Sequence, residues 1–322
     1  MRYDYAAMGF YTFDCLGWPV SAIPPGGGTI RIDEIALAVS GAAGTAVIAA
    51  AKLGLDCLAI GGYGRDMMGD WAMDRIAQFG IDTSGLQRLD GVPTSASIVL
   101  TRPDGSRPAL HVHGATGHFV VPESDWDRIT DARVFHLGGV GLMDAMDGAP
   151  NAALMAHAKR RGCITTVDVF AGSPADLPDV EAVLPHTDYF IPSVEEAQAL
   201  TGLADLGQMA RFFFDRGVKA CVFTLGADGA YYHHRDGESF IVPAFQIDVR
   251  CTCGCGDVFN AGFAAGLLRG MSAREAVQLA QACSALNATG LGSQAGVVDF
   301  AQVRAFMHST PTRASHHLAV AG

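Results

Sequence analysis

The chain has 322 residues, of which 49% are hydrophobic and 17% are charged. This length suffices for one large domain with a buried core. The formal net charge is −11 and no run of Lys or Arg exceeds three residues, which argues against nucleic acid or an anionic membrane as a partner. One uncharged run, Ile35–Ala51, is interrupted by Gly41 and Gly44 and is too short to span a bilayer comfortably. It predicts a strand, a glycine turn and a buried helix.

The eight cysteines show neither secretory spacing nor a C-x-x-C pair, and the N-terminus lacks the apolar core of a signal peptide. We therefore expect reduced thiols in a cytoplasmic protein. Cys251, Cys253 and Cys255 have a spacing that occurs in metal clusters. A tetrahedral zinc site needs four ligands, and the closest further candidates, His233 and His234, fall in a predicted hairpin, so we do not expect zinc here.

Short apolar runs alternate with helical segments along the chain. This alternation predicts an α/β fold with a mostly parallel sheet covered by helices on both faces. No internal repeat or linker divides the chain, so residues 1–322 are predicted to form a single domain. The expected strands are Tyr5–Gly9, Cys57–Gly61, Val134–Leu137, Ile164–Asp168, Tyr189–Ile191, Ala220–Thr224 and Gly229–His233. The expected helices are Gly44–Leu53, Met67–Phe79, Pro150–Arg161, Val194–Thr201, Leu206–Asp215, Asp257–Arg269 and Ala273–Asn287.

Two segments break this alternation. Phe13–Ile35 is rich in proline and glycine, and Ser95–His113 alternates in polarity around a turn at Pro103–Gly105. Both are predicted to form strand pairs added at the edge of the sheet. The polar tail after Phe306 is expected to be loosely ordered.

The most informative stretch is Cys251–Phe263, in which a loop of small residues opens directly into an apolar helical run. The amides of Gly254, Cys255 and Gly256, with the positive end of the helix dipole, are predicted to form an anion hole for phosphate. A carboxylate there would repel a simple anion. Asp257 makes sense as a general base that accepts a proton from a hydroxyl attacking a terminal phosphate.

This stretch closely resembles the second signature of the ribokinase/PfkB carbohydrate kinase family, D-T-T-G-A-G-D-x-F-x-x-G. The G-x-G-D-x-F-N-x-G portion is intact, whereas Cys251 and Cys253 replace the first Asp and the second Thr. The resemblance extends from Tyr5 to about Val298. It implies a ribokinase-like three-layer α/β/α sandwich with a small β lid formed by residues 13–35 and 95–115, which is often also a homodimer surface. It also implies ATP-dependent phosphorylation of a sugar or sugar-like hydroxyl, with Mg²⁺.

The resemblance also implies a set of substrate-binding residues. Ser40–Ala46 is similar to the family's G-G-x-x-x-N-x-A signature, with Gly41 in the turn and Thr45 in the Asn position. Asp14 matches a carboxylate that accepts hydrogen bonds from substrate hydroxyls, which suits an anion that can take two donors at once. Arg107, in the lid turn, is either a substrate contact or a solvated side chain.

For the nucleotide side, Ser193 and Glu196 match the family's N-x-x-E motif, in which the Glu organises water around Mg²⁺. The same pattern is a capping box for the following helix, and both roles can hold together. The strand–turn–strand around residues 222–230 resembles the family's nucleotide-side turn, and the region after it closes the adenine pocket. The residues implied in ATP binding are Ser193, Glu196, Thr224, Gly226, Gly229, Gln281 and Asn287.

Two other functions stay open on the sequence alone, a nucleoside kinase of the same fold and a non-catalytic relative that binds sugar or nucleotide. Retention of Asp257 argues against the second, because a pure binder gains nothing from a carboxylate in an anion hole. Cys251 stands where the family commonly has an Asp that helps to hold potassium. A neutral thiol is a poor ligand for a hard cation, so a need for potassium is doubtful.

Overall fold

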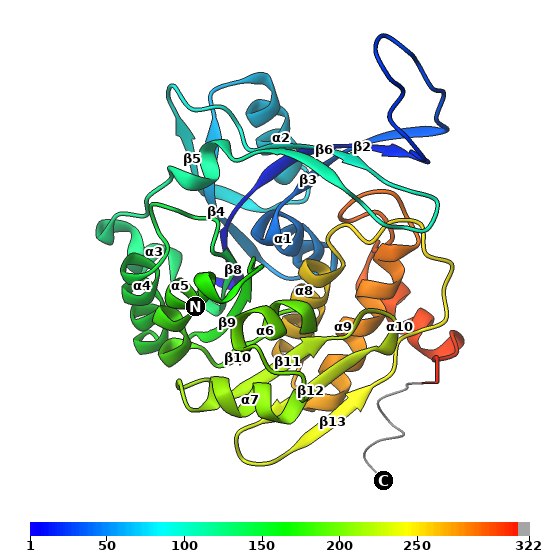
Figure 1. Ribbon diagram of the computed structural model, residues 1–322. Coiled ribbons are helices and arrows are strands. Elements are labelled where there is room, and N and C mark those ends of the chain that lie inside the picture. The colour runs from blue at the N-terminus through cyan, green and yellow to red at the C-terminus, as the bar shows by residue number, and fades with distance from the viewer. Residues whose placement is uncertain (315–322) are drawn as a thin grey trace.

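The computed structural model describes residues 1–314. Its centre is a nine-stranded sheet in the order β13-β12-β11-β10-β9-β8-β1-β4-β5 (Figure 1). The strands β5, β4, β1, β8, β9, β10 and β11, in this spatial order, run parallel. β12 and β13 form an antiparallel hairpin at one edge. The strand bounds are β1 Tyr3–Gly9, β4 Cys57–Gly64, β5 Asp82–Leu89, β8 Ala132–Val140, β9 Ile164–Val169, β10 Tyr189–Phe190, β11 Ala220–Thr224, β12 Ala230–His234 and β13 Ser239–Val242.

All seven predicted core strands are present, because apolar runs buried on both faces are typical of parallel sheets. Every residue of β4 is buried, for example. The sequence reading missed β5 and β13, which are the two edge strands. β5 carries polar residues along much of its length, and β13 is only four residues long, so neither shows a long apolar run.

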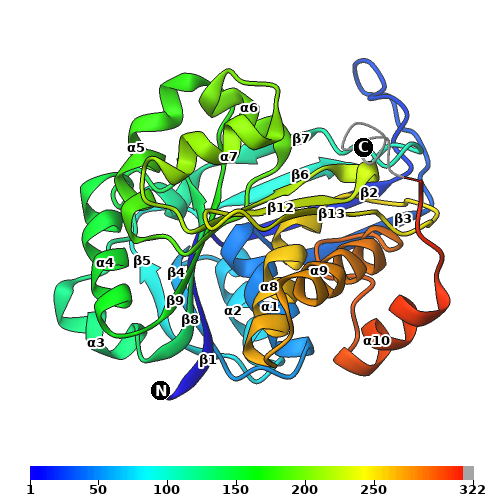
Figure 2. The same cartoon turned by 90° about the horizontal axis from the view of Figure 1, so that it is seen from below.

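Helices cover both faces of this sheet (Figure 2). One face packs against α1, α2, α8, α9 and α10, and the other against α3, α4, α5, α6 and α7. Small residues let α8 and α9 approach closely. A Cβ on Gly262 would lie 2.8 Å from the Cα of Ala280, and a Cβ on Gly266 would lie 2.8 Å from the Cα of Ala276. The helix bounds are α1 Ala42–Lys52, α2 Met67–Ala77, α3 Trp126–Ile129, α4 Ala149–Arg160, α5 Leu177–Val183, α6 Val194–Thr201, α7 Leu206–Phe214, α8 Cys255–Leu268, α9 Ala273–Ala288 and α10 Phe300–Ser309.

The lid is a second, four-stranded sheet in the order β3-β2-β6-β7. Its strands are β2 Thr12–Trp18, β3 Glu34–Ser40, β6 Ala96–Leu100 and β7 Ala109–Val112. The two irregular segments were expected at the edge of the main sheet, and they instead pair with each other. The reason is a separate core, in which Leu16 and Val99 of the lid pack against Cys251, Cys253 and Leu291. The lid therefore covers the glycine-rich loop.

The run from Ile35 to Ala51 folds as predicted. β3 ends at Ser40, Gly41 turns with φ of 85°, and α1 begins at Ala42. At the other end, α10 continues helical order past Phe306 to Ser309, so the start of the tail is more regular than expected. The rest of the predicted loose tail reaches residues 315–322, which lie outside the described residues. Within residues 1–314, no helix has the length and apolar character needed to cross a membrane.

Candidate active site

The glycine-rich loop forms an open nest of amides at the start of α8. Gly254 precedes the helix with φ of 67°, and a Cβ there would lie 2.8 Å from Thr45 Cγ2 and 2.9 Å from the Ser293 carbonyl oxygen. Only glycine fits this position without strain. Within the described chain, the N–H groups of Gly256 and Asp257 have no protein acceptor, and no atom lies within 4 Å of where a Gly256 Cβ would be. These donors are free for an anion.

Cys255, also predicted in the anion hole, differs from these two residues. Its N–H donates to the Thr252 carbonyl at 3.4 Å, so it is partly occupied by the loop itself. Its thiol points away toward α9, where Sγ lies 3.7 Å from the Ser284 carbonyl oxygen. Cys255 thus helps to shape the nest, and Gly256 and Asp257 provide its open donors.

Asn287 holds the loop from behind. Its amide nitrogen donates to the Cys253 carbonyl at 2.7 Å and lies 3.6 Å from Cys255 Sγ, and its side chain is fully buried. This placement fits support of the loop better than the direct nucleotide contact implied by the sequence. Gln281 lies earlier on α9 and is also buried, and its role in ATP binding stays a prediction.

Three carboxylates from different elements influence one another around this loop. Asp257 is in the first turn of α8, Glu196 in the first turn of α6, and Asp168 near the end of β9. Burial raises the pKa of all three, and the charge of Asp257 raises the pKa of the other two further. For Asp257, burial is opposed by the charge of Arg107 and the hydroxyl of Thr45, and the pKa rises to about 6.

The sequence reading missed Asp168 as a site residue and took it only as the end of a predicted strand. It is 8% exposed and accepts a hydrogen bond from the Val169 N–H at 3.0 Å. In open α/β sheets, ligands bind outside the carboxyl ends of the parallel strands. A carboxylate at the carboxyl end of a buried parallel strand was therefore the signal that was available.

Ser193 and Glu196 form the predicted capping box. Glu196 Oε2 accepts from the Ser193 N–H at 2.8 Å and from its hydroxyl at 2.7 Å, and Ser193 Oγ accepts from the Glu196 N–H at 3.2 Å. The cap fixes the position of Glu196, which interacts electrostatically with Asp257. The structural half of the prediction is confirmed, and the metal role of Glu196 stays a prediction.

The nucleotide-side turn also has the predicted shape. Thr224, at the end of β11, pairs with Ser193 in an isolated parallel bridge. Gly226 and Gly229 follow with φ of 56° and 107°. A Cβ on Gly229 would lie only 1.9 Å from the Val242 carbonyl oxygen, so this turn requires glycine.

Asp14 lies on the inner face of the lid and is 7% exposed. It pairs across the sheet with Ser97, which in turn pairs with His111. Thr12 Oγ1 donates to Asp14 Oδ1 at 2.9 Å, and Ser97 Oγ lies 3.1 Å from His111 Nδ1. Burial raises the pKa of Asp14, and hydrogen bonds from hydroxyls including Ser40 and Thr12 oppose this rise. The sequence reading missed Ser97 and His111, because the lid register alone brings them beside Asp14.

The other predicted substrate residues gather around the same space. Gly41 begins α1 and has no room for a side chain, since a Cβ would lie 2.4 Å from the Phe10 carbonyl oxygen. Thr45 is fully buried, and among the described residues its hydroxyl has no partner within hydrogen-bond geometry. Arg107 is exposed on the lid turn, yet its charge opposes the rise that burial causes in the pKa of Asp257 and of Cys255. The lid thus brings one cation to the nest.

Contacts between distant segments close the site. The hydroxyls of Ser40 and Ser293 are in contact, and the Gln294 side chain donates to the Val39 carbonyl. Lys52 Nζ donates to the carbonyls of Gln294 and Val297 at 2.7 and 2.8 Å. On the lid side, Thr252 Oγ1 donates to the Gly105 carbonyl at 3.3 Å. The glycine-rich loop is therefore held between the lid, α1 and the turn that follows α9.

Cys251 is fully buried beneath the lid. Its sulfur accepts a hydrogen bond from the Cys253 N–H at 3.4 Å and lies 3.7 Å from Thr101 Oγ1. Hydrogen bonding from the Cys253 side chain and backbone lowers the pKa of Cys251 and raises that of Cys253. This shift disfavours the neutral thiol expected at position 251, whose protonation state stays a prediction. Within residues 1–314, no group of three or more His, Cys, Asp or Glu side chains is arranged to hold a metal ion directly.

Comparison with known proteins agrees with this fold. The model of the pfkB family carbohydrate kinases matches residues 17–299. Ribokinase from Haemophilus influenzae is 28% identical over 279 residues, which are 84% of this chain and 88% of that protein. The 2-dehydro-3-deoxygluconokinase of Thermoproteus tenax is 30% identical over 263 residues, 77% of this chain and 78% of that protein. The fold matches Arabidopsis thaliana ribokinase complexed with ribose and ATP, with a TM-score of 0.81, 21% identity and coverage of 95% and 99%. The chain therefore belongs to the pfkB family of carbohydrate kinases, which transfer phosphoryl groups to hydroxyls.

Proposed function

We propose that this kinase transfers the terminal phosphoryl group of ATP to a hydroxyl of a sugar or sugar-like compound, with Asp257 as the general base. The observation that carries the proposal is the position of Asp257 in the first turn of α8, beside the open Gly256 amide. Its pKa of about 6 leaves the carboxylate ionised at neutral pH and basic enough to take a proton. The amides hold the negative charge that develops on the phosphoryl oxygens.

The acceptor is proposed to bind between the lid and α8. Asp14 accepts hydrogen bonds from its hydroxyls, and the buried hydroxyl of Thr45 and the close backbone at Gly41 bound the same space. Arg107 adds positive charge from the lid turn, which favours the approach of phosphate to a nest lined by carboxylates.

The donor set also fits Mg²⁺. Asp168 and Glu196 supply the hard carboxylate oxygens that this ion prefers, and the rise in their pKa values from the charge of Asp257 shows repulsion that a cation would relieve. Because the described residues hold no direct three-ligand cluster, we propose that Glu196 acts through water. Mg²⁺ supplies neutralisation of the phosphate charges when bound.

On the nucleotide side, we propose that ATP lies over the loops that leave β10 and β11. Ser193 and Thr224 are adjacent there through their parallel bridge. The turn at Gly226 and Gly229 provides backbone without side chains to obstruct the nucleotide. Gln281 is proposed to contribute from α9, and Asn287 to act through the loop that it supports.

A binding screen followed by turnover tests this proposal. Sugars and nucleosides are added in thermal-shift assays with and without a non-hydrolysable ATP analogue, and each hit is then tested for ATP consumption. We expect at least one sugar to stabilise the protein and to be phosphorylated. Turnover of nucleosides alone would favour the nucleoside kinase alternative, and binding without turnover would favour the non-catalytic one.

We also propose a homodimer through the outer face of the lid. Cys15 pairs with Leu37 and with Ile98, and Ile98 pairs with Leu110, so these residues form one row on that face. Leu37, Ile98 and Leu110 are 50%, 54% and 60% exposed, which is unusual for a contiguous apolar row. Sedimentation at micromolar concentration tests the proposal, and a monomer under those conditions would contradict it.

We predict little activation by potassium over sodium or a bulky organic cation. Sulfur is a soft ligand and a poor partner for potassium even as a thiolate, and Cys251 is already engaged by the Cys253 N–H. Cys251→Asp is expected to gain a potassium response in steady-state assays. Strong, saturable potassium activation of the unmodified kinase would contradict the prediction and would mean that main-chain carbonyls suffice.

A further inference from the structure

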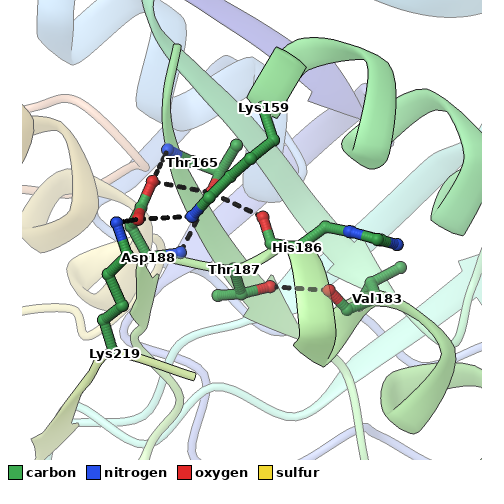
Figure 3. Close-up of polar contacts among 7 residues, drawn as sticks. All are labelled: Lys159, Thr165, Val183, His186, Thr187, Asp188 and Lys219. Atoms are coloured by element: carbon green, nitrogen blue, oxygen red, sulfur yellow. Dashed lines mark hydrogen bonds and ion pairs between the residues drawn. The ribbon is translucent and has the colours of Figure 1, made fainter. Parts of the chain in front are cut away.

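The chain has three lysines, Lys52, Lys159 and Lys219, among 22 basic residues. Two of them converge on one carboxylate far from the glycine-rich loop (Figure 3). Lys159 Nζ lies 2.5 Å and Lys219 Nζ lies 2.6 Å from the same oxygen, Asp188 Oδ1. Lys159 comes from the end of α4, and Lys219 directly precedes β11. Nearly all other basic residues of the chain are arginines. Both cations beside Asp188 are lysines, which carry a compact ammonium group in place of a guanidinium.

Both carboxylate oxygens of Asp188 have partners in this arrangement. Its second oxygen accepts from the Thr165 N–H at 3.0 Å and from the Thr165 hydroxyl at 3.1 Å. Burial alone would raise the pKa of Asp188, but the two lysines and Thr165 hold it below its ordinary value, so the carboxylate stays ionised. An ammonium has three donors, and within residues 1–314 each of these lysines bonds only to Asp188. Each keeps two donors for a ligand.

The two ammonium groups line a cleft of about 500 Å³ whose walls include Ile164, Asp188, Tyr189 and His234. Pockets for small molecules commonly have this size. The cleft lies at the N-terminal ends of β9, β10 and β11, whereas Asp168, Ser193 and Thr224 lie at or beyond their carboxyl ends. At about 3.3 Å per residue, Ile164 and Asp168 are about 13 Å apart along β9. The cleft is therefore separate from the candidate active site.

The local charge is positive although the whole chain carries −11. Two ammonium groups face one carboxylate. Arg160 is also close: burial is the main reason that the pKa of His186 is lowered, and the charges of Lys159 and Arg160 lower it further. His234, which lines the cleft, pairs with the exposed Asp236 at 3.4 Å. An ion pair that only stabilised the fold here would require one lysine. The second lysine leaves a net positive charge.

We propose that the cleft between Lys159 and Lys219 is a second binding site, which takes the phosphate group of a small phosphorylated metabolite. A phosphate monoester offers three acceptor oxygens and a charge near −2 to the four free ammonium donors. Charge-assisted hydrogen bonds of this kind are the stronger ones in proteins. The remaining volume, bounded by Ile164 and Tyr189, accommodates the organic part of the ligand. The site is independent of the role assigned to Asp257.

The rarity of lysine makes this proposal directly measurable. The kinase is saturated with a non-hydrolysable ATP analogue and Mg²⁺, so that the candidate active site is filled, and inorganic phosphate is titrated as the probe against chloride of equal ionic strength. Brief acetylation followed by peptide mass spectrometry reports the reactivity of each lysine. We expect phosphate to slow acetylation of Lys159 and Lys219 saturably, by at least about threefold, and to leave Lys52 unaffected.

Single variants decide whether both lysines form the site. Lys159→Met leaves Lys219 as the reporter, and Lys219→Met leaves Lys159, while Asp188 keeps one partner in each case. Each substitution is expected to weaken phosphate binding by about tenfold. Arg161→Met, which removes a neighbouring cation that is 3.9 Å from Asp127 rather than in the cleft, is the matched control and should change binding less than twofold. Equal slowing by chloride, or unchanged protection in both lysine variants, would overturn the proposal.

Discussion

Replacing Asp257 by Asn is expected to lower kcat by at least about 100-fold, the usual scale for loss of a general base. The amide has nearly the same shape as the carboxylate but cannot accept the proton of the attacking hydroxyl. ATP affinity should stay nearly unchanged, because the open Gly256 and Asp257 N–H groups belong to the backbone. Steady-state kinetics and equilibrium binding of the ATP analogue together measure the two effects.

The pH profile gives this prediction an independent readout. Burial raises the pKa of Asp257 to about 6, and the base acts only when it is ionised. In the unmodified kinase kcat/KM should therefore fall about tenfold for each pH unit below about 6, and the Asn variant should lose this inflection. Glu195→Gln removes an exposed carboxylate next to Glu196 and serves as the matched control. Near-normal turnover of Asp257→Asn would defeat the proposed mechanism.

The local parts of the fold were predictable because short sequence windows encode them. Apolar runs such as Cys57–Gly61 have one stable placement, at the centre of a sheet covered on both faces. The Gly254-to-Asp257 junction and the Ser193–Glu196 capping box depend on neighbours within four residues. Their shape in the structure agrees with the sequence reading.

The features that depend on pairing between distant strands could not be predicted from short sequence windows. The lid segments have the same alternation whether they extend the main sheet or pair with each other, and packing of Leu16 and Val99 over Cys251 decides between these arrangements. The placement of Ser97 and His111 beside Asp14 follows from strand register, which no local pattern specifies. Asp168 stands at the end of a predicted strand, but its proximity to Glu196 and Asp257 depends on how distant elements come together.

Protonation states were beyond the sequence for a related reason. Cys251 and Cys253 are two thiols with equal ordinary pKa values, and nothing in their spacing says which one ionises first. Hydrogen bonding from the Cys253 side chain, and less so from its N–H, lowers the pKa of Cys251, whereas the pKa of Cys253 is raised. This difference depends on contacts in the folded chain and not on residue type.

Asp14→Ala is expected to raise KM for the acceptor at least about tenfold, since it removes charge-assisted hydrogen bonds to substrate hydroxyls. KM for ATP should stay within about twofold of the original value, because Asp14 lies on the lid and the nucleotide loops leave β10 and β11. Cys15→Ala is the matched control: Cys15 is the next residue of β2, and successive side chains of a strand point to opposite faces. It should leave both constants nearly unchanged.

A stability measurement separates this loss of binding from a loss of folding. Burial raises the pKa of Asp14, so at neutral pH its ionised form destabilises the folded state relative to the unfolded chain. Removing the carboxylate should therefore leave the free energy of unfolding unchanged or higher while acceptor binding weakens. Such an exchange of stability for function is typical of binding sites. A lower melting temperature with unchanged acceptor KM would instead make Asp14 a structural residue of the lid. Weaker ATP binding with unchanged acceptor binding would place Asp14 on the nucleotide side of the active site and would contradict the prediction.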